Sequence, residues 1–198
     1  MTTERLLILA SASPRRADLL RTAGLSFVVR PLDIDESPRP GERPRELAER
    51  LAPAKAAALT APQQPALILA ADTVVAVGED ALGKPRDDAE ARLMLRRLAG
   101  RAHDVITAVA ARTVPEERLE TVTAVSRVVF APLSEEEIAW YAATGEGSDK
   151  AGAYALQGRG SLLVTRIEGS YTNVIGLPLE TVYPLLRRHG IPGVPRLV

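Results

Sequence analysis

Short apolar runs rich in leucine, isoleucine and valine alternate along the chain with amphipathic segments of about 10 to 15 residues. The runs predict buried strands and the segments predict helices with one apolar side. Strands are predicted over residues 5–10, 26–31, 66–71, 74–77, 103–112, 119–130 and 162–167. Helices are predicted from Pro14 to Gly24, over 45–59, from Asp87 or Asp88 to Gly100, from Ser134 to Ala143 and over 179–189. This alternation is typical of an α/β fold.

Residues with strong turn and capping preferences support these boundaries. Ser13 is a suitable cap for a helix that has Pro14 at its first position, and Ser134 with Glu137 forms a capping box. The glycine-containing turn after residue 77 predicts a hairpin that presents Lys84 on a loop. The strands over 103–112 and 119–130 are expected to pair antiparallel through a turn near Pro115.

Composition predicts one soluble globular domain spanning residues 1–198, with 46% hydrophobic and 25% charged residues. The 25 basic and 25 acidic residues cancel, so no excess charge attracts the chain to nucleic acid or to an anionic membrane. No apolar run approaches the roughly 18 residues of a membrane-spanning helix. The apolar run 6–12 is short for a signal peptide. We therefore expect a cytoplasmic protein.

The supply of metal-binding and nucleophilic side chains is limited. The chain has no cysteine and two histidines, which disfavours thiol chemistry and zinc or copper sites. Any metal is expected to be a hard cation such as Mg²⁺ or Mn²⁺. Lys55, Lys84 and Lys150 are the only lysines, so arginine provides the other 22 of the 25 basic residues. A lysine retained against this background suggests a site that needs a compact ammonium group, although three lysines can also remain by chance.

The segment Ser11-Ala12-Ser13-Pro14-Arg15-Arg16, between a predicted strand and a predicted helix, is the sharpest candidate for anion binding. A helix start has free N–H groups and a partial positive charge, so arginines there are unfavourable unless an anion offsets them. Two hydroxyls, backbone amides and two guanidinium groups form a suitable phosphate cradle. The alternative is an ordinary capped helix with solvated arginines.

Carboxylates and a glutamine supply further candidates. Asp72 ends an apolar run, where ligands gather in open α/β sheets, and could act as a general base or form a structural turn. The acidic turn with Asp33, Asp35 and Glu36 could hold Mg²⁺ together with substrate phosphates, or could be a solvated loop. Gln157, among glycines, has paired donor and acceptor groups that could read a base edge.

These segments occur in one order over nearly the whole chain. They are residues 9–16, Asp35-Glu36, 71–75, Gly83-Lys84-Pro85, 149–154 with Gln157-Gly158, and 176–179. Together they resemble the Maf family of nucleoside triphosphate pyrophosphatases. The resemblance implies an elongated mixed α/β sheet flanked by helices with a central cleft, similar to Maf and ITPase proteins, in a molecule that is often a homodimer.

The resemblance also implies roles for individual residues. Asp72 would be the base for the attacking water, and Asp35 or Glu36 would hold the divalent cation, Mg²⁺ or Mn²⁺. The triphosphate would be bound by Ser11, Ser13, Arg15, Arg16, Lys55 and Lys84. The acidic turn reads Asp-Ile-Asp-Glu where relatives often have glutamates, so either carboxylate remains a candidate.

Arg15, Thr73 and Gln157 resemble the branch of the family that prefers dTTP and UTP. The resemblance extends the expected substrates to modified pyrimidine nucleotides such as 5-methyl-UTP or pseudo-UTP. The expected reaction yields the monophosphate and pyrophosphate and would remove unwanted nucleotides from the pool. Two alternatives stay open: a 7-methyl-GTP pyrophosphatase, and a nucleotide-binding regulator of cell division and septum formation with little turnover. A nucleic-acid-binding module is disfavoured by the charge balance.

Overall fold

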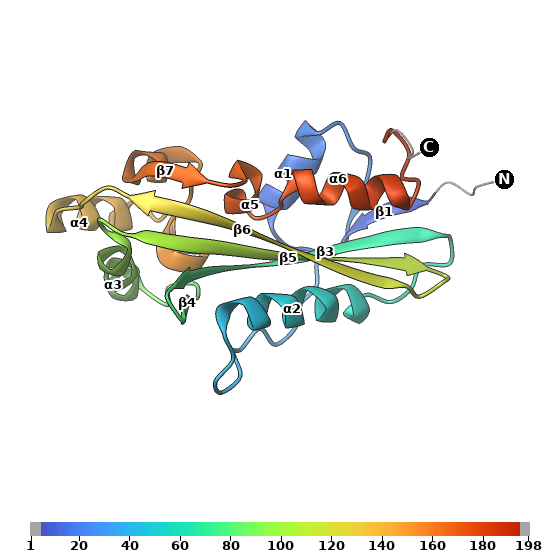
Figure 1. The fold of residues 1–198 in the computed structure, drawn as a ribbon, viewed down its shortest axis with the longest axis horizontal. Helices are drawn as coiled ribbons and strands as arrows, with labels where there is room; N and C mark the ends of the chain where they lie inside the picture. Colours follow the sequence, from blue (N-terminus) through green and yellow to red (C-terminus); the bar gives the residue numbers. More distant parts are fainter. Residues whose placement is uncertain (1–4, 195–198) are drawn as a thin grey trace.

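The computed structural model describes residues 5–194, and strand β3 (Ala66–Val77) runs through the centre of its sheet (Figure 1). The order across the sheet is β2 (Val28–Val29), β1 (Leu6–Leu9), β3, β5 (Ala102–Val114), β6 (Leu119–Phe130) and β7 (Val164–Glu168), and β4 (Asp80–Leu82) also pairs with β3. The β2–β1 and β1–β3 pairs are parallel and all other pairs are antiparallel. The predicted mixed sheet is confirmed.

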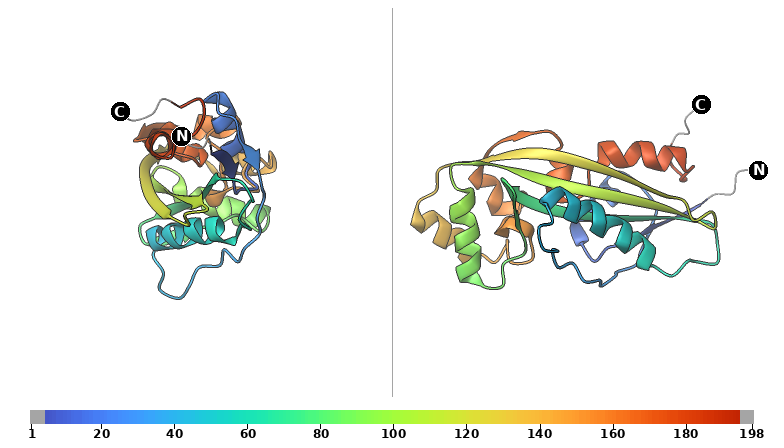
Figure 2. Two further views of the ribbon diagram at one scale, coloured as in Figure 1. Left: turned by 90° about the vertical axis from the view of Figure 1, so that its right-hand side faces the viewer. Right: turned by 60° about the horizontal axis from the view of Figure 1, so that its bottom comes forward.

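Helices cover both faces of this elongated sheet (Figures 1 and 2). Helix α2 (Pro44–Ala58) lies on one face, where Ile68 and Ala70 of β3 join its apolar cluster. Helices α1 (Pro14–Thr22), α5 (Tyr171–Ile175) and α6 (Leu179–Arg188) lie on the other, with Leu69 and Ala71. Helices α3 (Asp88–Leu98) and α4 (Glu135–Ala143) pack at one end. Within residues 5–194, no helix is long and apolar enough to cross a bilayer.

The prediction of two strands, 66–71 and 74–77, separated at Asp72-Thr73, is wrong. β3 is continuous because β5 pairs with it from Ala66 to Ala76, through the polar pair. Successive side chains of a strand point to opposite faces, so each polar residue can find partners without interrupting the backbone ladder. Asp72 and Thr73 therefore lie in the middle of a strand.

Other boundaries depart from prediction where local backbone geometry decides. The strand expected over 26–31 contains two residues, Val28 and Val29. Residues 162–163 belong to the 3₁₀ helix η2 (Gly158–Leu163), so β7 begins at Val164. Helix α5 was not predicted; Ser170 caps it by accepting a hydrogen bond from the Asn173 N–H. The caps at Asp87 and Ser134 and the antiparallel β5–β6 pair are confirmed.

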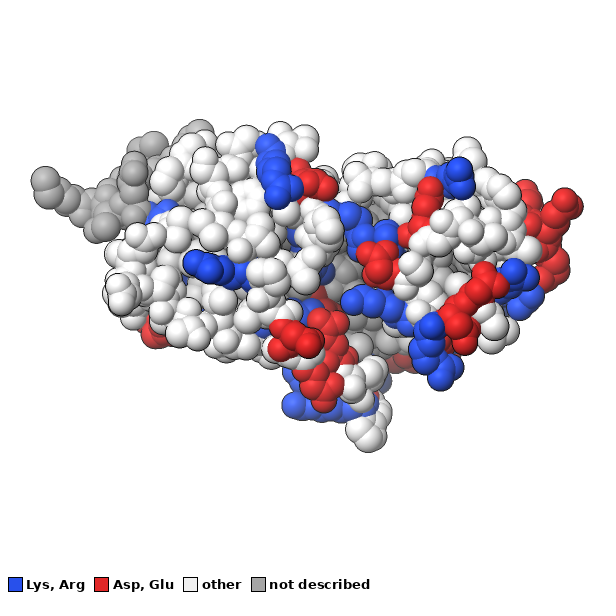
Figure 3. All heavy atoms as spheres, turned by 180° about the vertical axis from the view of Figure 1, so that it is seen from behind, with Lys and Arg blue, Asp and Glu red and all other residues white. Residues whose placement is uncertain are grey.

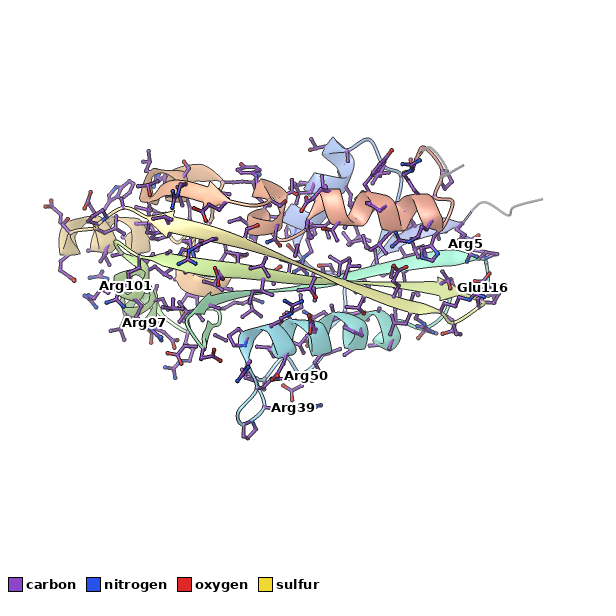
Figure 4. All side chains as sticks on the ribbon, in the orientation of Figure 1. Arg5, Arg39, Arg50, Arg97, Arg101 and Glu116 are labelled. Atoms are coloured by element: carbon purple, nitrogen blue, oxygen red, sulfur yellow. The ribbon has the colours of Figure 1, made fainter. Side chains whose placement is uncertain are left out.

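Many arginines of this arginine-rich chain form ion pairs that join elements on the surface (Figure 4). Arg5 donates to both carboxylate oxygens of Glu116, at 2.8 and 2.7 Å, and links the start of β1 to the β5–β6 turn. Arg50 of α2 donates to Glu42 at 2.5 and 2.8 Å and to the Ser37 carbonyl at 3.0 Å. Arg50 therefore holds the loop between the acidic turn and α2 against that helix.

We expect His103 to make stability depend on pH. Its ring is 3% exposed, and its Nε2 lies 2.9 Å from the Tyr154 hydroxyl. Burial lowers the pKa of His103 to about 4. Because a histidine in the unfolded chain has a pKa near 6.5, the unfolded state alone binds this proton between those values. The contribution of His103 to the free energy of unfolding is therefore complete above about pH 6.5, and about 3 kcal/mol of it is lost as the pH falls to about 4.

Urea unfolding from pH 7 to pH 4 measures this effect. His103→Gln keeps a polar partner for Tyr154 but does not titrate, so its stability should fall less steeply than that of the wild type over the same range. Parallel pH profiles for the two proteins would show that His103 is not the group responsible.

Candidate active site

A gap in strand pairing along one edge of β3 organises the candidate site. β1 pairs with residues 66–69 of β3, and β4 pairs with residues 75–77. In the described chain no strand pairs with residues 70–74 on that side, and we call this stretch the open edge. Asp72 and Thr73 lie on it with their side chains toward opposite faces, so side chains from both faces can meet there.

The open edge forms the floor of a polar cleft. Its walls come from the β1–α1 turn, the acidic turn, α2, the β3–β4 hairpin, the glycine-rich segment 149–157 and the end of α5. Figure 3 shows basic and acidic side chains gathered around a hollow near the middle of the long face seen from behind. The predicted central cleft is thus present, and Asp72 lies in it although it does not end a strand.

On the α2 face of the sheet, a lysine lies between two carboxylates. Lys55 Nζ is 2.7 Å from Asp72 Oδ1 and 2.6 Å from Glu36 Oε1. The side chains of Lys55 and Asp72 are 11% and 8% exposed. Burial disfavours the charged form of Glu36, but the hydrogen bond and charge of Lys55 outweigh it, so the pKa of Glu36 lies below its usual value. The Asp72 carboxylate and the Lys55 ammonium group therefore lie side by side with little exposure to solvent.

On the opposite face, Arg16 of α1 reaches the open edge. Its Nη1 donates to the Ala71 carbonyl at 2.7 Å, its Nε to the Gly176 carbonyl at 2.8 Å, and its Nη2 to Thr73 Oγ1 at 3.0 Å. Leu69 O accepts from Ala10 N of the β1 segment, and Ala71 O, two residues on, faces the same side. Arg16 Nη1 therefore donates to the carbonyl that the next backbone N–H of a pairing strand would otherwise reach. Burial lowers the pKa of this guanidinium, whereas the charges of Asp72 and Glu36 favour its charged form.

The start of α1 presents unsatisfied donors to the cleft. Ser13 occupies the N-cap position, but the predicted side-chain cap is wrong because its hydroxyl makes no capping bond, and the first turn has no acidic residue. Ser11 Oγ accepts from Ser13 N at 3.2 Å and from Arg16 Nη1 at 3.3 Å, which leaves its own O–H for another acceptor. Free amides, a hydroxyl and the nearby Arg15 form an anion-binding arrangement.

All three lysines of the chain line the cleft. Lys55 comes from α2, Lys84 from the loop after β4, and Lys150 from the glycine-rich segment. The scarcity of lysine had pointed to Lys55 and Lys84, and the same signal could have identified Lys150. Asp149 was also missed: it pairs with Lys150 and accepts from Arg15 Nη1 at 3.3 Å. These two ion pairs outweigh burial and lower the pKa of Asp149.

The glycine-rich segment approaches the sheet closely. Gly152 has a φ of 73°, and a Cβ there would lie 2.9 Å from Cγ1 of Val75. Glycine therefore allows this wall to pack against β3 beside the open edge. Gln157 is exposed at the rim of the cleft, where its amide can meet a ligand.

The predicted site residues are largely brought together, with one clear exception. Ser11, Ser13, Arg15, Arg16, Glu36, Lys55, Asp72, Thr73, Lys84 and Gln157 all line the cleft. Asp35 does not. It is exposed, and its Oδ1 accepts a hydrogen bond from Ser37 N at 2.9 Å. Neighbours in an extended segment point to opposite sides, so Glu36 faces the cleft and Asp35 faces solvent.

Of the three carboxylates that line the cleft, Glu36 and Asp72 lie close together, whereas Asp149 pairs with Arg15 and Lys150. Over residues 5–194, no group of three or more His, Cys, Asp or Glu side chains could hold a metal ion by itself. Glu36 and Asp72 nevertheless lie close together, because one oxygen of each contacts Lys55 Nζ, and a metal ion would use the second oxygen of each carboxylate. Mg²⁺ is commonly held by one or two carboxylates together with substrate phosphates and water, so these residues fit a cation that arrives with a phosphorylated substrate.

Comparison with known proteins gives matches over nearly the whole chain. Residues 6–189 match the family model described as Maf-like protein. A dTTP/UTP pyrophosphatase of Myxococcus xanthus strain DK1622 is 51% identical over 189 residues, which cover 96% of this chain and 95% of that protein. The protein of that name from Geobacter sulfurreducens is 50% identical, with coverage of 93% and 96%. The one from Syntrophomonas wolfei is 48% identical, with coverage of 92% and 96%.

Proposed function

Because this chain belongs to the Maf-like protein family, we propose that it is a nucleoside triphosphate pyrophosphatase that hydrolyses dTTP and UTP to the monophosphate and pyrophosphate. One observation carries the proposal: the open edge of β3 places the buried carboxylate of Asp72 in a cleft that is also lined by Arg15, Arg16 and all three lysines. Relatives about 50% identical over nearly their whole length are named dTTP/UTP pyrophosphatases. This hydrolysis would lower the concentration of unwanted nucleoside triphosphates in the nucleotide pool.

Hydrolysis requires a water molecule to attack the α-phosphorus while the bond from phosphorus to the bridging oxygen of the β-phosphate breaks. Asp72 accepts a proton from this water as the new P–O bond forms, and pyrophosphate leaves with the bridging oxygen. Lys55 holds the Asp72 carboxylate in place at 2.7 Å. Because the electrons of the broken bond stay on pyrophosphate, nearby cations stabilise this leaving group.

The triphosphate is proposed to bind between the start of α1 and the three lysines. Ser11, Ser13 and Arg15 contact its oxygens beside the free amides of α1, and Lys55, Lys84 and Lys150 contribute charge from the other walls. Arg16 has most of its N–H groups committed to protein acceptors, so it supplies charge and one remaining N–H.

A divalent cation, Mg²⁺ or Mn²⁺, would be held by Glu36 and Asp72 together with phosphate oxygens. When bound, it would neutralise phosphate charge and favour attack at phosphorus. Asp35, which points to solvent, is not assigned to this role.

Base preference is proposed to come from Gln157, Arg15 and Thr73. Gln157 presents an amide donor and acceptor at the cleft rim, which match the O4 and N3–H groups that uracil and thymine share. Modified pyrimidines with the same edge, such as 5-methyl-UTP and pseudo-UTP, are expected substrates. We also propose that residues 1–198 form a single domain and that two copies of the chain form a homodimer in the cytoplasm. This homodimer would act on free nucleotides and would not bind nucleic acids or membranes.

Phosphate release from a panel of nucleoside triphosphates with Mg²⁺ or Mn²⁺, with and without added inorganic pyrophosphatase, tests the function. Release from dTTP and UTP only when pyrophosphatase is added establishes α–β cleavage and pyrimidine preference. Release without it indicates removal of the γ-phosphate, and preference for 7-methyl-GTP indicates the other branch. Nucleotide binding without release favours the division regulator.

Lys84→Ala is expected to lower kcat/KM about 10- to 100-fold, the range of a hydrogen bond between a charged donor and a phosphate oxygen. Lys84 is exposed on its loop, so its removal should leave the melting temperature within about 2 °C of the wild type. Arg166→Ala is the matched control, because Arg166 is an exposed cation on β7 that does not line the cleft. Loss of stability in step with activity would indicate instead that Lys84 is structural.

A further inference from the structure

Thr107 is a fully buried hydroxyl behind the cleft floor. It lies on β5 directly opposite Thr73 of β3 and is 0% exposed. The two hydroxyl oxygens are 2.9 Å apart, which is a hydrogen bond. Thr107 does not line the cleft, so no ligand bound there can explain why a polar group is buried at this position.

The hydrogen bonds around this pair form a connected series. Arg16 Nη2 donates to Thr73 Oγ1 at 3.0 Å, and Thr107 Oγ1 lies 3.4 Å from the Asn173 carbonyl. Either hydroxyl can be the donor of the 2.9 Å bond between Thr73 and Thr107; the proton of the other then goes to the carbonyl of Asn173 or of Gly176, each 3.4 Å away. We call the sequence Arg16 to Thr73 to Thr107 to Asn173 the relay. Hydrogen bonds in such a series polarise and strengthen one another.

The far end of the relay is anchored to two strands. Asn173 is 0% exposed, and its Nδ2 donates to the Val105 carbonyl and to Ser126 Oγ, both at 2.9 Å. Val105 belongs to β5 and Ser126 to β6. The relay therefore connects Arg16, at the cleft, to strands β5 and β6 of the sheet.

The relay also bears on Asp72. Arg16 donates to the Ala71 carbonyl, which belongs to the peptide bond that joins Ala71 to Asp72 on the open edge. A misplaced guanidinium would move this peptide and the carboxylate next to it. Because Thr73 Oγ1 accepts from Arg16 and lies within hydrogen-bond distance of Thr107 and of the Gly176 carbonyl, its hydroxyl is committed to the protein and acts on a ligand through Arg16.

We propose that Thr107 is a positioning residue that orients Thr73 and Arg16 and thereby aligns the Asp72 edge for hydrolysis. This inference rests on the proposed function. Since alignment matters most in the transition state, loss of the Thr107 hydroxyl should lower kcat and leave KM nearly unchanged.

The test compares Thr107→Val with Thr113→Val in steady-state kinetics with dTTP. Thr113 is the matched control, a 2% exposed threonine on β5 whose hydroxyl bonds to Arg118 at the β5–β6 turn. Thr107→Val should lower kcat about tenfold with KM changed less than about threefold, and Thr113→Val should leave kcat unchanged. Thr107→Ser, which keeps the hydroxyl, should recover most of the lost rate.

The proposal is overturned if Thr107→Val keeps the wild-type kcat, if Thr113→Val loses as much, or if KM alone changes. If Thr107→Val does not fold, Thr107→Ser and Thr107→Ala replace it, because both lack the methyl group and only serine keeps the hydroxyl. Equal kcat values for that pair would also overturn the proposal. A wild-type protein that releases no pyrophosphate from any nucleotide would instead contradict the proposed function, so the two failures are distinguishable.

Discussion

Replacing Asp72 with asparagine is expected to lower kcat about 10²- to 10⁴-fold, the usual contribution of a general base. Asparagine preserves the shape of the side chain but cannot accept the proton of the attacking water. Kinetics with dTTP and UTP, with pyrophosphatase coupling, measure the loss, and nucleotide binding measured separately shows whether the cleft is intact. Retention of the full rate would contradict the role assigned to Asp72.

Replacing Lys55 with methionine is expected to damage both stability and activity. The change removes the ammonium group that lies between Asp72 and Glu36 and leaves a carboxylate that is 8% exposed without its partner. Breaking a buried ion pair in this way costs about 3 kcal/mol or more, which for a chain of this size lowers the melting temperature by about 6 to 12 °C. Thermal unfolding and kcat should both register the change.

The double variant Lys55→Met with Asp72→Asn separates the two effects. Because it removes the uncompensated charge, it should unfold at a higher temperature than Lys55→Met alone, yet it should remain inactive. If Lys55→Met unfolded at the wild-type temperature, the pair would be neither a stabilising contact nor the element that holds Asp72.

The sequence allowed the residues that line the cleft to be predicted better than their geometry. The apolar run before Asp72 correctly indicated a buried strand, and the structure places Asp72 in the cleft. The run could not indicate that the strand continues, because that depends on the pairing of β5, some 30 residues later in the chain. In the same way, charge at the start of α1 predicted anion binding, whereas the commitment of Arg16 to Ala71 and Gly176 arises only after folding.

Residues with weak local patterns were the ones missed. Thr107 lies in an apolar strand where a threonine is unremarkable, and its meaning depends on Thr73 opposite and on Asn173 of an unpredicted helix. Lys150 lies beside Asp149 in a segment whose clearest local signal is its glycines. The positions of these side chains depend on contacts with residues that are distant in sequence, not on their neighbours along the chain.

The two faces of β3 also constrain which changes of chain length the protein can tolerate. Asp72 and Thr73 are neighbours in sequence but serve different faces, so their roles depend on whether each is at an even or odd position along the strand. One residue inserted between positions 69 and 72 would exchange the faces and set a carboxylate toward Asn173 and a hydroxyl toward Lys55. The loop over residues 60–65 can change length without this exchange. We therefore expect insertions to be tolerated in this loop before β3 and not within the strand.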